Sequence, residues 1–330
     1  MNSKNINRCH GSPLHILAFF DGRLGHEKQT KGILKSVSRL TPTAVSNVVL
    51  SGFSPGTCVL NWLRFLGTFL LPARNTVSRF QVDLILGTGS HTHIPMLLCK
   101  RKCGARVVTC MTPSFFLKNR IDLCFIPKHD RPREGHNVLI TEGPPNTAVP
   151  SYSHDRRRGL ILVGGVDEKS HHWDTGEILS MIQYIIYRNP LVTWTLSSSP
   201  RTPADTVGGL ADLAENETNA AFFRCDETPD GWIEKEYAGN DSVWITADSM
   251  SMVYEALTAG CRVGILPVRW KRKDCKFQRS LNDLMEAGRV TAYDDWKTGC
   301  SELNRGETLD EAGRCAREIL HRWWPERLGS

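Results

Sequence analysis

Residues 245–267, ITADSMSMVYEALTAGCRVGILP, carry the residue types and spacing of a phosphate-binding site. The pattern predicts a strand, a short polar turn, a helix and a second strand. The first N–H groups of a helix lack intrahelical partners and lie at the positive end of its dipole, so they bind phosphate. Ser249 and Ser251 are therefore candidate diphosphate contacts, and Glu255, one turn into the helix, is a candidate acceptor for ribose hydroxyls. An ordinary strand–helix–strand unit with a serine cap is the alternative.

Two further loops in the second half of the chain follow predicted strands and suit a diphosphate. Gly164 and Gly165 come directly after an apolar run, and the missing Cβ atoms let a phosphate or a sugar approach the backbone N–H groups. Residues 195–203, TLSSSPRTP, combine three serines with one guanidinium, a pairing that binds phosphate well. We predict contacts from Ser197 and Arg201. A loop that only caps the following helix is the alternative.

Residues 21–34 supply the candidates for acid–base chemistry. Two glycines let the chain turn here before a predicted helix. His26 and Asp21 are the predicted general bases, with Glu27 beside them. Histidine titrates near neutral pH, and burial raises the pKa of a carboxylate. The alternative is a glycine turn in which Asp21 caps the helix and His26 is solvated.

Neither a metal site nor a dinucleotide cofactor is predicted. His91 and His93 are separated by one residue, but no carboxylate or thiol stands at the usual spacing for a third ligand. The adjacent pair His171 and His172 is expected to point in different directions. No DxD motif lies between the predicted nucleotide-contacting loops, and GTGSHTHIP is not the GxGxxG fingerprint.

Short apolar runs alternate with helix-length segments along the whole chain. They are HILAFF, AVSNVVL, VDLILG, ARVVTC, LCFIP and NVLIT in the first half, and GLILVGG, LVTWTLS, AAFFRC, SVWIT and CRVGILPV in the second. This alternation predicts an α/β protein with parallel, doubly wound sheets. Residues 143–158 are rich in proline and charge, as is typical of a linker. We therefore expect two Rossmann-like domains, residues 1–148 and 149–305, and a last helix in residues 306–330 that packs back on the first.

Charge is distributed unevenly between the halves. The formal net charge is +6, but residues 1–150 hold 19 Lys and Arg against 7 Asp and Glu, so the remainder is acidic. This basic half favours an anionic membrane surface. The predicted membrane contacts are Trp62, Phe65 and Phe69, with Arg64, Arg74 and Arg79 around them. A core-facing helix is the alternative. Nucleic acid is not an expected partner, because no recognition-helix, RNP or OB pattern occurs.

Composition indicates an ordinary globular protein. Hydrophobic residues make up 40% and charged residues 23% of the chain. The 11 cysteines include no CxxC pair, which is typical of reduced thiols in a cytosolic protein. The longest apolar region, residues 59–71, is shorter than the ~20 residues that span a bilayer. We therefore expect a cytoplasmic location, with peripheral attachment to the inner face of a membrane.

Several of these segments together resemble one known family. They are DGRLGHEKQT, DLILGTGSHTHIP, DLCFIPKHD, NVLITEGPPN, LILVGG, TLSSSPRTP and ITADSMSMVYEALTAGCRVGILP, in this order and spacing. The family includes the plant mitochondrial-fission (elongated-mitochondria) factor and bacterial relatives, and it is similar in architecture to GT-B glycosyltransferases. The resemblance implies two domains facing a cleft and matches Ser249, Ser251 and Glu255 to the donor-binding helix. Relatives often carry arginine where Ser198 and Ser199 stand here.

The expected function is therefore a metal-independent glycosyltransferase of the GT-B type. The resemblance implies a nucleotide-sugar donor, UDP- or GDP-linked, and a lipid-linked or polysaccharide acceptor, with no cofactor. The second domain would hold the donor, and the first would face the acceptor and the membrane. Two alternatives stay open: a non-catalytic membrane adaptor of the fission-factor type, and a nucleotide-sugar epimerase, which needs no acceptor.

Overall fold

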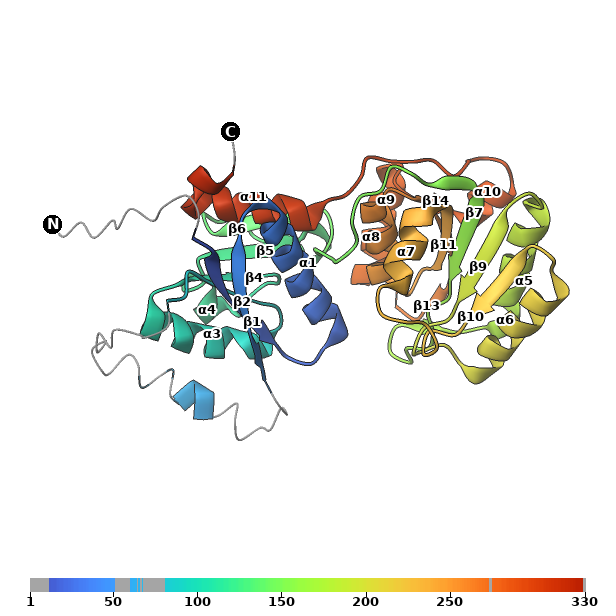
Figure 1. Cartoon of the computed structure of the whole chain (residues 1–330). Coiled ribbons are helices and arrows are strands. Elements are labelled where there is room, and N and C mark those ends of the chain that lie inside the picture. Colours follow the sequence, from blue (N-terminus) through green and yellow to red (C-terminus); the bar gives the residue numbers. More distant parts are fainter. Residues whose placement is uncertain are drawn as a thin grey trace. The chain divides into compact units, whose positions relative to one another are not determined.

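The computed structural model describes residues 12–50, 60–63, 65, 67, 81–272 and 275–328. The chain divides into two compact units, Met1–Thr147 with Glu311–Ser330, and Ala148–Asp310 (Figure 1). Each unit holds a parallel sheet whose strands alternate with helices along the chain. The predicted α/β class with two parallel sheets is confirmed.

In the first unit, six described strands form a parallel sheet in the order β2-β1-β3-β4-β5-β6. The strands are β1 (Leu14–Phe20), β2 (Thr43–Val49), β3 (Leu84–Gly87), β4 (Arg106–Thr109), β5 (Leu123–Pro127) and β6 (Val138–Thr141). The helices are α1 (Leu24–Leu40), α3 (Ser90–Cys103), α4 (Phe115–Lys118), η1 (Lys128–Asp130), α11 (Glu311–Trp323) and η2 (Pro325–Arg327). The chain places β2 on one side of β1 and β3 on the other, so the strand order reverses beside β1.

Helix α11 belongs to the first unit although it follows the second unit in sequence. Its buried residues Ala316, Ile319 and Leu320 recur at helical spacing, which gives the helix one apolar face. This face packs in one cluster with Ile33 and Val37 of α1, and all five side chains are fully buried. The last helix therefore completes the core of the first unit.

In the second unit, six described strands form a parallel sheet in the order β10-β9-β7-β11-β12-β14, and β13 pairs antiparallel with β8. The strands are β7 (Asp155–Leu162), β8 (His171–His172), β9 (Thr193–Ser197), β10 (Ala220–Phe223), β11 (Asn240–Thr246), β12 (Arg262–Leu266), β13 (Arg269–Trp270) and β14 (Thr291–Ala292). The helices are α5 (Thr175–Arg188), α6 (Ala204–Asn216), α7 (Trp232–Gly239), α8 (Met250–Ala259), α9 (Lys276–Glu286) and α10 (Tyr293–Lys297). The strand order reverses between β7 and β11.

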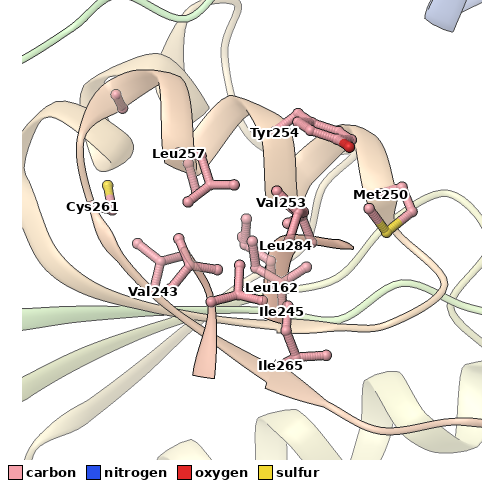
Figure 2. Close-up of a cluster of buried hydrophobic side chains, with 14 of the residues drawn as sticks. Leu162, Val243, Ile245, Met250, Val253, Tyr254, Leu257, Cys261, Ile265 and Leu284 are labelled. Carbon is pink, nitrogen blue, oxygen red and sulfur yellow. The ribbon is translucent and has the colours of Figure 1, made fainter. Parts of the chain in front are cut away.

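Helix α8 lies over an apolar cluster on the sheet of the second unit (Figure 2). Val253 and Leu257, one turn apart on the helix, pack with Val243 and Ile245 of β11 and with Ile265 of β12. All five side chains are buried. Burial of each such side chain contributes about 1.5–3 kcal/mol. The start of α8 is therefore held in a fixed place beside the strand ends.

The predicted membrane-facing aromatic surface does not hold at Phe65. This side chain is 7% exposed and lies in the apolar core of the first unit with Ile85 and Val107. Trp62 packs against the same cluster, 6.1 Å from Phe65 between ring centroids. Phe69, Arg64, Arg74 and Arg79 lie outside the described residues. Among the described helices, none combines the length and the apolar character that crossing a bilayer requires.

Candidate functional site

The candidate donor site lies where the strand order of the second sheet reverses. In open parallel sheets, ligands bind at the carboxyl ends of the strands beside such a reversal. Three neighbouring strands, β9, β7 and β11, end here and continue into loops. These loops contain Arg201, the pair Gly164 and Gly165, and the turn before α8.

The two glycines allow these loops to come into contact. A Cβ atom on Gly164 would lie 2.2 Å from both Asp248 Oδ2 and Ser249 Oγ, and one on Gly165 would lie 2.0 Å from the carbonyl oxygen of Arg201. The Gly164 N–H donates to Thr246 Oγ1 (2.7 Å), and the Gly165 N–H donates to Asp248 Oδ2 (3.1 Å). Both glycines therefore position the loops, and their N–H groups bond within the protein.

Asp248 is the central polar residue of this site, and it was not among the residues predicted from the sequence. Its side chain is 2% exposed, and its Oδ2 accepts hydrogen bonds from Arg201 Nη2 (2.8 Å) and Ser249 Oγ (3.2 Å). Its other oxygen, Oδ1, is buried and has no hydrogen-bond partner within the described ranges. The Arg201 side chain stays 45% exposed. The carboxylate thus fixes one end of a guanidinium that also faces solvent.

The charge of Arg201 also influences a second carboxylate, that of Asp167. The pKa of Asp167 is lowered, first by the hydrogen bond from the Lys169 N–H and to a smaller extent by the hydrogen bond from Ser170 and by the nearby His171 and Arg201. Arg201 therefore forms an ion pair with Asp248, and its charge also favours the ionised form of Asp167. A diphosphate bound beside Arg201 would need further donors, such as backbone N–H groups and hydroxyls.

The start of α8 supplies those further donors. Ser249 is the N-cap residue, and its side chain makes no capping hydrogen bond. Ser251 is exposed in the first turn. The first N–H groups of an α-helix have no intrahelical acceptor, so this end of α8 presents donors and a positive dipole end. The predicted contacts Ser249 and Ser251 thus both lie at the helix start.

In the serine loop after β9, Ser197 and Ser199 bond to different neighbours, and the predicted contact of Ser197 with a diphosphate stays a prediction. Ser197 is buried, and its Oγ donates to the carbonyl oxygen of Phe223 at 3.0 Å, so it is bonded to the loop end of β10. Ser199 Oγ instead donates to the Gly164 carbonyl oxygen at 2.9 Å. Ser199 therefore joins the serine loop to the glycine turn. Three consecutive serines gave no basis for choosing among them.

Glu255 lies inside the second unit. It is 3% exposed, and the hydroxyl of Tyr237 lies 3.5 Å from its Oε2. The pKa of Tyr237 is raised well above its ordinary value by burial and then by the charge of Glu255. The proposed contact of Glu255 with a ribose stays a prediction.

His171 is hydrogen-bonded to the backbone of the glycine turn. It is 2% exposed, its Nε2 donates to the Gly165 carbonyl oxygen at 3.0 Å, and its Nδ1 lies 2.7 Å from Ser170 Oγ. His172 is exposed. The predicted divergence of this histidine pair is confirmed, and His171 is a structural residue of the loop.

The first unit places the predicted general bases at its own strand reversal. Asp21 follows β1, and its Oδ2 accepts a hydrogen bond from His26 Nδ1 at 2.8 Å. The Asp21 side chain is 1% exposed and that of His26 is 24% exposed. Gly89, after the neighbouring strand β3, has φ +110°, and a Cβ atom there would lie 2.2 Å from Asp21 Oδ2 and 2.7 Å from His26 Nδ1. The pair therefore requires glycine at this position.

This arrangement suits proton transfer at one atom. Because a carboxylate only accepts, Nδ1 of His26 carries the proton and Nε2 is the atom that takes up another. The hydrogen bond from Nδ1 to Asp21 holds the ring in this tautomer. Two neighbouring histidines have lowered pKa values: His91 chiefly through burial and then through the charge of Arg23, and His93 to about 4 chiefly through burial, with smaller contributions from the nearby His26 and His91. His93 is therefore neutral at pH 7.

No metal centre is formed by the described residues. Among them, no group of three or more His, Cys, Asp or Glu side chains could hold an ion. His93 is buried, and its Nε2 lies 3.2 Å from Thr109 Oγ1.

Three solved structures share the fold at low sequence identity. A UDP-N-acetylglucosamine 2-epimerase matches with a TM-score of 0.57 and 12% identity over 95% of this chain and 96% of that one. The S. aureus MnaA–UDP co-structure matches with a TM-score of 0.56 and 12% identity over 96% and 98%. The UDP-GlcNAc 2-epimerase from Neisseria meningitidis bound to UDP-GlcNAc matches with a TM-score of 0.51 and 12% identity over 94% and 99%. These likenesses establish a GT-B-like fold.

The family is established by sequence. No curated protein matches the chain significantly. The family model described as Mitochondrial fission ELM1 matches residues 24–323 of the 330. The motifs that predicted this family span both units. The chain belongs to the mitochondrial fission ELM1 family.

Proposed function

We propose that the protein transfers a sugar from a nucleotide-diphosphate donor, UDP- or GDP-linked, to a hydroxyl of a lipid-linked or polysaccharide acceptor without a metal ion. One observation carries the donor half of this proposal. Arg201, the glycine turn and the start of α8 meet at the strand reversal of the second sheet, with Arg201 exposed toward solvent. Solved structures of similar fold that contain UDP or UDP-GlcNAc support the same donor class.

The second unit would stabilise the leaving group. When the bond between the anomeric carbon and the diphosphate oxygen breaks, its electron pair leaves with the diphosphate, whose negative charge increases. The N–H groups and positive dipole end of α8, together with Arg201, face that charge. In this proposal they replace the metal ion that balances such a charge in many transferases.

The first unit would activate the acceptor. As the acceptor oxygen forms its bond to the anomeric carbon, its proton passes to Nε2 of His26. Asp21, 2.8 Å from Nδ1, stabilises the resulting imidazolium. The glycine at position 89 lets the carboxylate and the imidazole meet in this geometry.

An epimerase is the second candidate, and two of the three structures of similar fold described above, both UDP-GlcNAc 2-epimerases, support it. An epimerase inverts one carbon of the nucleotide sugar and releases the nucleotide sugar whole. A transferase releases a nucleoside diphosphate. The identity of the product therefore separates the two. A membrane adaptor of the fission-factor type would give neither product.

The proposal is tested by incubating the full chain with UDP- and GDP-sugars and a membrane lipid extract, with and without EDTA. We expect release of nucleoside diphosphate that survives EDTA and falls by roughly 10²-fold or more in His26→Ala. Strict dependence on Mg²⁺ or Mn²⁺ would overturn the mechanism. An epimerised nucleotide sugar without diphosphate release would favour the epimerase, and binding without any turnover would favour the adaptor.

A further inference from the structure

Two adjacent phenylalanines project from the first unit where α4 begins. Phe115 and Phe116 are 83% and 79% exposed, and their rings contact each other edge to face at 5.8 Å between centroids. The next residue, Leu117, is 2% exposed and anchors the turn in the core with Ile121 and Ile126. Large aromatic side chains are mostly buried, and neighbouring exposed ones mark interaction sites. The turn is thus held firmly while both rings point outward.

Basic residues follow this aromatic pair in the chain and also occur in the segment that is hydrogen-bonded to α4. Lys118 Nζ donates to the carbonyl oxygen of Arg133 at 3.1 Å, and Asn137 Nδ2 donates to that of Lys118 at 2.7 Å, so residues 131–137 lie against α4. The two segments, residues 112–120 and 131–137, contain four Lys and Arg and a single carboxylate, Glu134. The basic residues are Lys118, Arg120, Arg131 and Arg133.

We propose that this aromatic–basic surface docks the protein on an anionic lipid bilayer. It comprises Phe115, Phe116, Lys118, Arg120, Arg131 and Arg133. Aromatic rings insert at the boundary between headgroups and acyl chains, and each nearby cation adds attraction to anionic headgroups. Stable peripheral binding needs two such signals, and the surface supplies both. The proposal does not depend on the assigned sugar-transfer reaction.

Charge favours a membrane over a second copy of the chain. A two-fold contact through this surface would bring two sets of cations together, and like charges repel. A bilayer containing phosphatidylserine offers a continuous surface of opposite charge. Phe115 and Phe116 take the place of Phe65, which was predicted to contact the membrane but is buried in the structure.

The test is co-sedimentation of the full chain with phosphatidylcholine vesicles, with and without phosphatidylserine. One variant, Phe115→Ser with Phe116→Ser, removes the rings, and a second, Arg133→Glu, reverses one charge. Two matched controls lie in the second unit: Leu191→Ser, at a residue 87% exposed, and Arg156→Glu, at an exposed arginine of β7. Unchanged thermal melting shows that each variant folds.

We expect the wild type to prefer vesicles with phosphatidylserine and to lose binding as salt rises. The affinity of the double phenylalanine variant for vesicles should fall by about tenfold or more. Arg133→Glu should weaken binding chiefly at low salt. Both controls should bind as the wild type does. Equal wild-type recovery on both vesicle types would overturn the proposal. Unchanged binding of the double phenylalanine variant would also overturn it. A third contradictory result would be displacement of the protein from vesicles by single-stranded RNA that occupies the same surface.

Discussion

Replacing Asp248 with asparagine tests whether Arg201 contacts the diphosphate of a nucleotide. In the structure, Asp248 Oδ2 lies 2.8 Å from Arg201 Nη2 and 3.1 Å from the Gly165 nitrogen. A diphosphate that binds Arg201 meets this carboxylate as a like charge. Asparagine keeps the shape and one acceptor oxygen and removes the negative charge. We therefore expect Asp248→Asn to bind UDP or GDP more tightly than the wild type.

The magnitude follows from the distances and the exposure. Two unit charges about 5 Å apart interact by about 3 kcal/mol at an effective dielectric constant of about 20. Because Arg201 is 45% exposed, solvent and salt screen most of this interaction energy. A gain of about 1 kcal/mol, or roughly fivefold in Kd, is what we expect. The lost ion pair should lower the free energy of unfolding by about 1 kcal/mol or less, because its arginine is half exposed.

Isothermal titration calorimetry with UDP and with GDP measures this directly. The matched control is Asp212→Asn, which neutralises an exposed aspartate on α6 of the same unit. The control should bind as the wild type does. A Kd that is unchanged in Asp248→Asn, or that rises, would refute the reasoning. A rise would mean that the carboxylate itself accepts a hydrogen bond from the ligand.

Three further outcomes follow from the first unit. Asp21→Asn should lower turnover by about 10²-fold or more while leaving the Kd for UDP unchanged, because the imidazole of His26 loses its orienting carboxylate; loss of nucleotide affinity would contradict the assigned role. Gly89→Ala forces a Cβ atom to 2.2 Å from Asp21 Oδ2 at φ +110° and should lower the Tm more than Gly104→Ala does. At Gly104 φ is +72°, but no atom lies within 4 Å of the added Cβ. An equal fall in Tm would mean that backbone strain alone, and not the contact with Asp21, causes the loss. The pKa of His93 is about 4 when folded and near 6.5 when unfolded, so the unfolded chain binds the proton first as pH falls. Stability should therefore drop by on the order of 3 kcal/mol between pH 6.5 and 4, and in His93→Gln urea unfolding across this range should show a smaller drop.

Regular elements were predictable from sequence where their pattern was long. A helix was expected within residues 245–267, and α8 spans Met250–Ala259, because a serine turn precedes it and Gly260, at φ +86°, ends it. The strand β14, Thr291–Ala292, was not predicted, because two residues show no periodicity. Phe65 was assigned to the wrong side of its segment, since the same helical spacing of aromatic residues fits a core and a membrane face.

The two candidate sites differ in how much of each the sequence could reveal. Asp21 follows β1 directly and His26 lies in the first turn of α1, five residues later, so their pairing needed no knowledge of topology. Asp248 and Arg201 are 47 positions apart and meet only because β9, β7 and β11 are neighbours in the sheet. The sequence showed only that a carboxylate and a guanidinium each follow a predicted strand. Without the strand order, the contact between the two side chains could not be predicted.

Amide hydrogen exchange with and without saturating UDP and GDP tests the central claim most directly, because it locates the nucleotide on the chain. The account predicts slower exchange in peptides that cover residues 163–167, 198–203 and 247–253, around Gly164, Arg201 and Ser249, with one of the two nucleotides at least. Peptides of α5 and α6 on the same unit serve as internal controls and should be unchanged. The absence of protection by either nucleotide, or protection confined to other segments, would contradict a diphosphate site at the strand reversal of the second sheet.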